Sequence, residues 1–322
     1  MIPPRLAVGG LPKGPVGGTI LSRLKDSYLD SLLSVAEVST ESAARNAVDR
    51  GGADAALVIP HGLTRAARAA ENVDSAASPV SVTVYHRNSA GPAPGIVRTI
   101  VATVLDSYIG RDVAVRTARA QDYPDWSDAV RDSVFNFYLN WLASPRPMFL
   151  GRSAEPARGV APVPLSASLK VGILDLDAEG NSLSPAFADQ VINVLRSSTL
   201  VEPFRLPVRD SNRLAAKVSQ GRLALVLNIP RGYGDSLVNN RPIRPLNALL
   251  APGPAGQWAA AAVNQSLRRV FSARFIAQLC ARRRVFDSEL ERRAFVNRVA
   301  AQALDNWQQS AISIRDETPR SR

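Results

Sequence analysis

Two short stretches of similar sequence decide the fold that we expect: residues 54–63 read DAALVIPHGL, and residues 223–233 read LALVLNIPRGY. Each is an apolar run that leads into Ile-Pro-x-Gly, and each follows a segment of helical character that ends in glycine. An apolar run without alternation is typical of a strand that is covered on both faces of its sheet. Proline cannot donate a hydrogen bond to a neighbouring strand, so the strands should end at Pro60 and Pro230. We therefore predict a buried central strand in a domain that occurs twice.

The segments around the two stretches agree in type and order. In each half the periodicity predicts strand, helix, strand, helix, central strand, a further strand, a long helix, a final helix and a last short strand. We expect these elements, apart from the central strands, at 5–8, 19–28, 35–38, 40–51, 80–85, 96–108, 126–142 and 148–150, and again at 169–174, 185–195, 204–208, 210–221, 243–250, 258–271, 289–307 and 311–314. Strands that alternate with helices indicate crossover connections. The expected fold class is α/β, with two tandem copies of a small domain that has a mainly parallel or mixed sheet, helices on its faces, and C-terminal helices.

The chain is long enough for two such domains. It has 322 residues, of which 46% are hydrophobic and 21% charged, and each half can bury a core. Residues 151–168 are rich in Pro, Ala, Ser and Gly, which is typical of an exposed linker. We therefore predict a first domain at 1–150 and a second at 169–322. Pro242 and Pro245 favour an edge position for the strand expected at 243–250.

The positive charge suggests two classes of partner. A net charge of +11 and a pI near 10.6 fit either nucleic acid or an anionic membrane surface. The densest cluster is Arg282–Arg284, whose role the sequence leaves open, with Arg292 and Arg293 nearby. The chain has no ribonucleoprotein-type aromatic motif, no zinc-finger spacing and no Gly-Arg tail. We expect no nucleic acid and favour a solvated basic surface near anionic lipid headgroups.

Few residues offer catalytic or metal-binding chemistry. Cys280 is the single cysteine, which excludes an internal disulfide, and its apolar neighbours favour a buried, inert thiol. Two histidines, His61 and His86, cannot form a His-rich metal site. No run of 18 apolar residues is present and residues 1–5 lack a signal-peptide pattern, so as written we expect the chain to be soluble. We predict no catalytic, cofactor-binding or metal-binding residues, and no cofactor.

Three groups of residues could still carry chemistry. The first is a set of glycines near the first strand: Gly9, Gly10, Gly14, Gly17 and Gly18. Because these glycines do not follow the GxGxxG spacing, a turn is favoured over a phosphate-binding loop. The second is Asp175 with Asp177 at the end of a strand, where turn capping is favoured over catalysis because no partner base accompanies them. His61 follows the central strand, and Arg231 occupies the equivalent position in the second repeat. A polar residue just past a strand end is expected to be solvated. The third is an aromatic set at helical spacing, which favours a core or interface role (Phe135, Phe137, Tyr138, Trp141).

The repeated stretches resemble a known family. ESAARNAVDRGGADAALVIPHGL, VSVTVYHRN and GIVRTIVATVLDSYIG in the first half resemble the extracellular domain of ABC type-2 (ABC-2) transporter permeases. So do LKVGILDLDAEGNSLSPAFADQV, LVLNIPRGY and PAGQWAAAAVNQSLRRV in the second. The similarity covers residues 5–110 and 169–271. The chain departs from the family in lacking its membrane helices, and the first half lacks the acidic turn after the first strand.

The resemblance implies a non-enzymatic extracellular portion of an exporter permease for drugs or lipids, at the extracellular face of the cell membrane. Its implied partners are membrane helices, a separate ATPase subunit and an exported small molecule or lipid. The alternative is a soluble two-domain α/β protein that binds a ligand in a cleft between the copies. Two copies side by side would favour the exporter. A cleft with two or more connecting strands would favour the binding protein. The single linker expected from the sequence argues against the binding protein. An enzyme near Asp175 and Asp177 is a third, weaker hypothesis.

Overall fold

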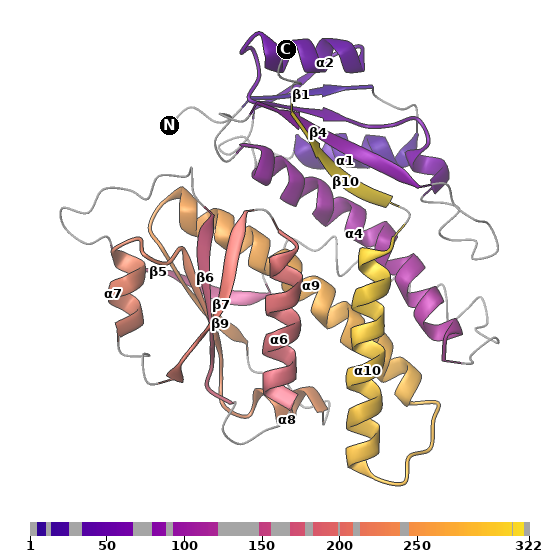
Figure 1. The fold of residues 1–322 in the computed structure, drawn as a ribbon, viewed down its shortest axis with the longest axis vertical. Coiled ribbons are helices and arrows are strands. Elements are labelled where there is room, and N and C mark those ends of the chain that lie inside the picture. The colour runs from indigo at the N-terminus through magenta and orange to yellow at the C-terminus, as the bar shows by residue number, and fades with distance from the viewer. Residues whose placement is uncertain are drawn as a thin grey trace. The chain divides into compact units, whose positions relative to one another are not determined.

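The protein is a mixed α/β chain that forms two five-stranded sheets with helices (Figure 1). This confirms the predicted fold class. The computed structural model describes residues 5–10, 14–25, 34–66, 79–87, 93–121, 148–155, 168–177, 183–198, 200–208, 213–238, 245–310 and 312–318. The chain divides into two compact units, one formed by residues 1–144 and 305–322 and the other by residues 145–304.

The first unit contains a sheet in the order β10-β4-β3-β1-β2. Strand β1 pairs in parallel with both β2 and β3, β4 runs antiparallel to β3, and β10 runs parallel to β4. All four side chains of β3 are buried, as predicted for the central strand, and burying a side chain such as Leu57 contributes about 2 kcal/mol. The strands are β1 (Arg5–Gly9), β2 (Ser34–Glu37), β3 (Ala55–Val58), β4 (Val80–His86) and β10 (Ile312–Glu317).

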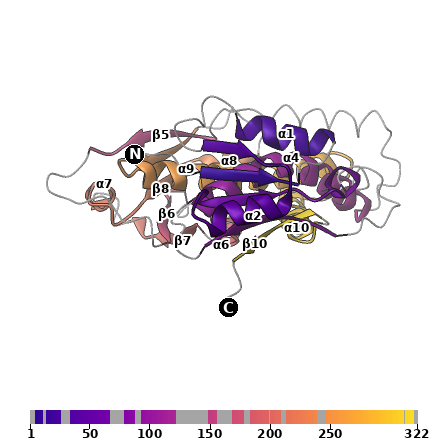
Figure 2. The same ribbon diagram turned by 90° about the horizontal axis from the view of Figure 1, so that it is seen from above.

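Helices cover both faces of this sheet, with α1 and α2 on opposite sides (Figure 2). Helix α2 (Glu41–Asp49) begins at the predicted cap, because the hydroxyl of Thr40 accepts a hydrogen bond from the amide of Ala43 at 3.1 Å. Helix α4 (Ala93–Arg119) is longer than predicted. Helix α1 (Pro15–Leu24) begins four residues earlier than predicted, so that Gly17 and Gly18 lie inside it. Proline suits a first helical position, which explains the early start.

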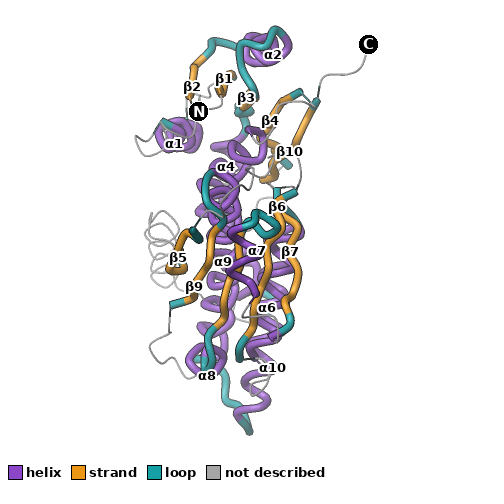
Figure 3. Tube along the Cα trace, turned by 90° about the vertical axis from the view of Figure 1, so that its left-hand side faces the viewer, coloured by secondary structure: helices purple, strands orange, loops and turns teal. Residues whose placement is uncertain are grey.

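The second unit repeats this design in the order β5-β9-β8-β6-β7. Figure 3 shows β6 and β7 running side by side. The pairings match those of the first sheet, since β6 is parallel to β7 and β8, β9 is antiparallel to β8, and β5 is parallel to β9. The strands are β5 (Phe149–Ser153), β6 (Leu169–Asp175), β7 (Val201–Leu206), β8 (Leu225–Ile229) and β9 (Leu246–Leu250). The helices are α6 (Leu183–Arg196), α7 (Leu214–Ser219), α8 (Tyr233–Val238), α9 (Pro254–Ala281) and α10 (Glu289–Gln308).

The helices of the second unit lie on both faces of its sheet, with α7 on one side and α6 on the other (Figure 1). Leu214 and Val218 of α7 form a core cluster with side chains from one face of the strands, including Leu174 and Val226. Gly221, with φ +68°, ends the segment after α7, and Gly51, with φ +74°, does the same after α2. A left-handed glycine after a helix supports the prediction that both helices stop there.

The last strand of each repeat completes the sheet of the other repeat. Strand β5 closes the first repeat in the sequence but pairs with β9, whereas β10 closes the second repeat but pairs with β4. The compact units therefore differ from the consecutive domains predicted at 1–150 and 169–322, because residues 305–322 belong to the first unit and residues 145–150 to the second.

Because of the exchange, the structure differs from two local predictions. The linker predicted at 151–168 begins inside β5, which extends to Ser153, and residues 156–167 lie outside the described part of the chain. The prediction that the strand at 243–250 lies at an edge is wrong, because β9 has β8 on one side and β5 on the other. Pro245 precedes the first residue of β9, so it does not interrupt the hydrogen bonds of that strand.

Candidate functional site

The carboxyl ends of β6 and β8 are the place in the second unit where an α/β sheet usually positions function. The two strands are parallel neighbours, and the chain leaves β6 for β7 on the opposite side of β6 from β8. Open α/β sheets bind ligands outside the carboxyl ends of the strands at such a reversal of strand order. Here β6 leads into Asp175 and Asp177, and β8 leads into the turn before α8.

The two aspartates fill this position themselves. Oδ1 of Asp175 accepts a hydrogen bond from the amide of Asp177 at 3.1 Å, which closes a turn at the end of β6. The carboxylate of Asp177 then accepts two hydrogen bonds from the backbone. Its Oδ1 accepts one from the amide of Gly232 at 2.7 Å, and its Oδ2 accepts one from the amide of Gly234 at 2.8 Å. Both aspartate side chains are buried. This confirms the turn-capping role favoured by the sequence.

The capping restricts what this end of the sheet can do. Both oxygens of Asp177 are held by backbone amides, so this carboxylate is fixed as an acceptor and is poorly placed to take a proton from a substrate. The amides of Gly232 and Gly234, which could otherwise bind an anion, already have an anionic partner within the chain. The geometry therefore favours a structural role for the pair over a catalytic one.

A buried polar pair lies beside this turn. Tyr233 opens α8 and is only 1% exposed, and its ring lies 5.2 Å from that of Phe187 on α6. Arg274 of α9 is 5% exposed, and its guanidinium lies 5.5 Å from the centre of the same Phe187 ring. Nε of Arg274 donates a hydrogen bond to the side-chain oxygen of Gln190 at 3.0 Å. Three helices of the second unit thus surround one guanidinium and one phenol.

Burial shifts the proton equilibria of both groups. It lowers the pKa of Arg274 to about 10, because the charged guanidinium loses hydration, while Tyr233 opposes the shift. It raises the pKa of Tyr233 for the same reason, and the positive charge of Arg274 opposes that change. Arg274 is thus a buried cation at neutral pH. Its Nη2 atom and the hydroxyl of Tyr233 lack hydrogen-bond partners within the described part of the chain.

An unmatched guanidinium next to a phenol has the chemistry of an anion receptor, since both groups can donate to a carboxylate or phosphate oxygen. The sequence patterns did not single out this pair. One signal was present, because Arg274 is spaced four residues from Val270 and three from Ala277, on an apolar stripe of α9. A place on such a stripe is the signal that this arginine departs from the usual exposure of arginine side chains.

Among the described residues, the corresponding strand end of the first unit carries Gly9 and Gly10. Gly9 lies so close to α2 that an added Cβ would be 2.4 Å from the carbonyl oxygen of Thr40, and Gly10 has φ +70°. Gly9 therefore serves close packing against the start of α2, and Gly10 serves a turn, as favoured by the sequence. His61 follows β3 and is exposed, as is its counterpart Arg231, so both are solvated as predicted.

The other candidates that the structure describes, Cys280 and His86, do not gather into a site. Cys280 is 2% exposed, and burial raises the pKa of its thiol to about 11, which confirms the prediction of a buried thiol. His86 is half-buried, with Nδ1 3.1 Å from the backbone oxygen of Arg87. Phe135, Phe137, Tyr138 and Trp141 lie outside the described residues.

The described residues lack two further features, a cluster of metal ligands and a membrane-spanning helix. No group of three or more His, Cys, Asp or Glu side chains is placed to hold a metal ion in the described part of the chain. Among the described helices, none combines the length and the apolar character needed to cross a membrane.

Comparison with known proteins identifies no relative. No protein-family model matches the sequence, and neither the curated proteins nor the solved structures contain a similar chain. What the fold defines is a class: a mixed α/β protein with two sheets of the same strand order and a reciprocal exchange of their last strands.

Proposed function

We propose that the chain is the non-enzymatic extracellular portion of an ABC-2 type exporter permease, with two ectodomains in one polypeptide. The observation that carries the proposal is the pair of equivalent sheets, β10-β4-β3-β1-β2 and β5-β9-β8-β6-β7, each completed by the last strand of the other repeat. An exporter built from two permease halves requires two ectodomains as a pair. Exchanged strands hold such a pair together more firmly than a flexible linker does.

The polar groups at the strand ends support a protein that does not chemically change its substrate. The carboxylate of Asp177 is committed to two backbone amides. In this proposal ATP is used by a separate subunit, and the chain guides a drug-like or lipid substrate after it leaves the membrane helices of its partner. Its location is then the extracellular face of the cell membrane.

Export from living cells tests the proposal. We expect deletion of the coding sequence in the source organism to raise the cellular content of at least one lipophilic dye or lipid, and the wild-type chain to restore export. Ile312→Asp, which places a charge at a buried position of β10, should fail to restore it. Arg315→Asp is the matched control, because it changes an exposed residue of the same strand and should restore export. Unchanged content across a broad panel of dyes and lipids would contradict the proposal.

One observation favours the alternative, a soluble two-domain protein that binds a ligand in a cleft between the copies. The chain passes between the compact units at 144/145 and again at 304/305, which is one connection more than the sequence predicted. Within the second unit, Nη2 of Arg274 and the hydroxyl of Tyr233 are suited to hold an anion, which would be a ligand site separate from that cleft. Titration calorimetry of the purified chain with small carboxylates and phosphate esters tests for ligand binding. A ligand whose binding is lost in Arg274→Met and Tyr233→Phe, together with unaffected export, would favour a binding protein over an exporter and place its site inside the second unit.

A further inference from the structure

The loop that joins α9 to α10 presents basic and apolar side chains together. We call residues 282–290 the basic tip. Arg282, Arg283 and Arg284 are all exposed. Val285 is 94% exposed and Leu290 is 75% exposed. Only one other large apolar side chain is exposed in the described part of the chain, so apolar exposure is concentrated at the tip. In Figure 1 the loop lies at the lower end of α10.

The loop has a defined conformation. The amides of the three arginines bond back to carbonyl oxygens of the last turn of α9, at 3.0 to 3.3 Å. Phe286 packs on Phe295 of α10 with 5.3 Å between ring centres. That contact anchors the loop and leaves Val285, the residue before it, in solvent.

The acidic residues in and beside the tip form no ion pair with the three arginines among the described residues. Glu289 pairs with Arg292 at 3.4 Å and with Arg293 at 3.5 Å. The carboxylate of Glu291 accepts a hydrogen bond from the backbone amide of Asp287 at 3.0 Å. None of Arg282, Arg283 and Arg284 forms an ion pair with a residue that the structure describes. Arg284 lies 5.1 Å from the centre of the Phe295 ring, a contact that leaves its charge intact.

We propose that the basic tip is a membrane contact that docks on a bilayer surface containing anionic lipids. The arginines supply attraction to phosphate headgroups, while Val285 and Leu290 are positioned to enter the boundary between headgroups and acyl chains. Both kinds of contact are needed to explain the tip, because charge alone gives no reason to expose two large apolar side chains. The inference does not rest on the exporter proposal, since it concerns a lipid surface and no transported substrate.

Nucleic acid fits these observations less well. Proteins that bind single strands stack bases on accessible aromatic rings, whereas Phe295 is buried and Phe286 is half-buried against it. Binding to a duplex backbone would use the arginines but would leave Val285 and Leu290 without a role. The lipid surface accounts for every exposed side chain of the arginine triplet and of its apolar neighbours.

Vesicle binding by the full chain tests the proposal. The probes are vesicles of phosphatidylcholine with phosphatidylglycerol, and vesicles of phosphatidylcholine alone. We expect binding to the anionic vesicles that weakens with salt, and little binding to the neutral ones. The triple variant Arg282→Glu, Arg283→Glu, Arg284→Glu should bind anionic vesicles about 100-fold more weakly, since each basic residue near such a surface contributes about fivefold.

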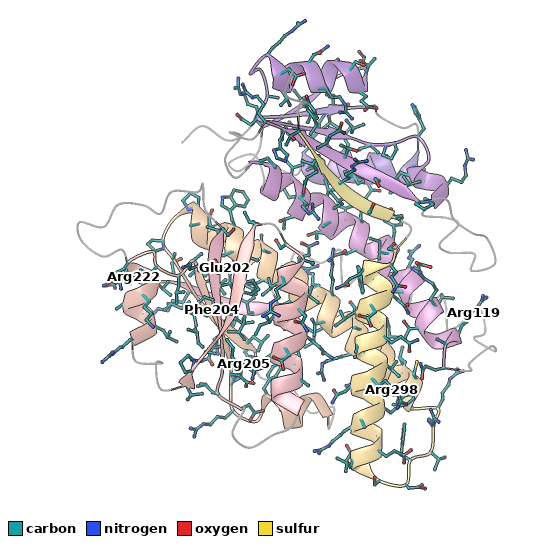
Figure 4. All side chains as sticks on the ribbon, in the orientation of Figure 1. Arg119, Glu202, Phe204, Arg205, Arg222 and Arg298 are labelled. Atoms are coloured by element: carbon teal, nitrogen blue, oxygen red, sulfur yellow. The ribbon has the colours of Figure 1, made fainter. Side chains whose placement is uncertain are left out.

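A matched control separates local contact from net charge. The triple variant Arg196→Glu, Arg213→Glu, Arg222→Glu changes the charge by the same amount at exposed residues of the same unit. Figure 4 shows one of these, Arg222, beside α7, on the other side of the sheet from Arg298 of α10. The control should lose much less affinity than the tip variant. The double variant Val285→Ser, Leu290→Ser should also weaken binding while the salt dependence persists.

Three results would overturn the proposal. The first is equal loss of vesicle binding in the tip variant and the control, which would assign binding to net charge. The second is wild-type vesicle binding by the Val285→Ser, Leu290→Ser variant, which would leave the apolar side chains without a role. The third is vesicle binding that the tip variant retains, together with affinity for single- or double-stranded DNA that it loses, which would assign the tip to nucleic acid.

Discussion

Trp307 donates a hydrogen bond from its indole nitrogen to Oδ1 of Asp106 at 3.2 Å, although 201 positions separate the two residues in the chain. Both side chains are buried. One residue earlier, the amide group of Asn306 donates to the hydroxyl of Thr117 at 2.9 Å. These contacts attach the last turn of α10 to α4, so that the chain is already fixed in the first unit when β10 begins.

The first prediction concerns this attachment. Trp307→Phe removes the donor while keeping an aromatic ring, and we expect the free energy of unfolding to fall by about 1 to 3 kcal/mol. Chemical denaturation followed by circular dichroism measures the change. Trp258→Phe is the control, because Trp258 is a buried tryptophan of α9 whose indole nitrogen makes no hydrogen bond to a described residue. A larger loss in the control would argue against a specific role for the bond to Asp106.

The second prediction follows from the exchange of β5 and β10. Fragments 1–168 and 169–322 each lack the strand that completes their sheet, so neither should reach a native-like stability alone. Each would leave one long side of β4 or β9 unpaired. Mixed together, the fragments should form a 1:1 complex in size-exclusion chromatography with light scattering. Two stable fragments that stay monomeric in the mixture would contradict the exchange.

The third prediction concerns the cap made by Asp177. Asp177→Ala removes both acceptors of the amides of Gly232 and Gly234, and we expect a loss of about 2 to 4 kcal/mol in the free energy of unfolding. Asp177→Asn keeps one good acceptor and should lie between the alanine variant and the wild type. The control Asp189→Ala removes an exposed carboxylate paired with Arg205 and should cost less than about 1 kcal/mol. Equal losses in the two alanine variants would contradict a capping role.

The fourth prediction compares two glycines of the first repeat. Gly9→Ala would place a Cβ 2.4 Å from the oxygen of Thr40 and 2.7 Å from Cβ of Ala44, so it should destabilise the first unit by about 2 kcal/mol or more. Gly18→Ala meets nothing within 4 Å inside α1 and should instead stabilise by up to about 1 kcal/mol. Thermal unfolding of the two variants shows whether each substitution stabilises or destabilises the protein. Stabilisation by both would show that α2 does not approach β1 this closely in solution.

The fifth prediction concerns pH. Burial raises the pKa of the Cys280 thiol from its ordinary value of 9.0 to about 11. The unfolded chain therefore loses this proton first, and the stabilising contribution is complete below pH 9 and is lost as the pH rises through about 11. The free energy of unfolding should fall in this window by up to about 1.4 kcal/mol per pH unit.

The variant Cys280→Ala isolates this contribution. Its stability should depend less on pH than that of the wild type between pH 8 and about 10, because the tyrosines that begin to titrate in this range are common to both proteins. Native Cys280 should also react slowly with a thiol reagent. Identical pH dependence in the two proteins would contradict the burial of the thiol.

Much of the fold could be predicted from local patterns. The doubled Ile-Pro-x-Gly stretches identify β3 and β8, and Thr40 marks the start of α2 because a hydroxyl side chain can accept the first free amides of a helix. The order of elements follows from the same reasoning. These features depend on neighbours in sequence, which is the information that a single chain carries.

The exchange of strands could not be predicted in this way. The segments at 148–150 and 311–314 occupy equivalent positions in the two repeats, and each is a short apolar stretch suited to pair with either β4 or β9. The choice depends on contacts between distant residues, such as Met148 donating its amide to the side-chain oxygen of Asn264 at 2.7 Å. The burial of Arg274 escaped prediction for a related reason, because arginine in an alanine-rich helix usually faces solvent.

The pairing of β4 with β10 sets the timing of folding on the ribosome. Strand β10 emerges roughly 225 residues after β4, which at about 5 to 20 residues per second means a delay of about 10 to 45 s. Throughout that delay the native partner of β4 is missing, even though the rest of the first sheet has been synthesised. The half of the protein that is made first is therefore the half that is finished last.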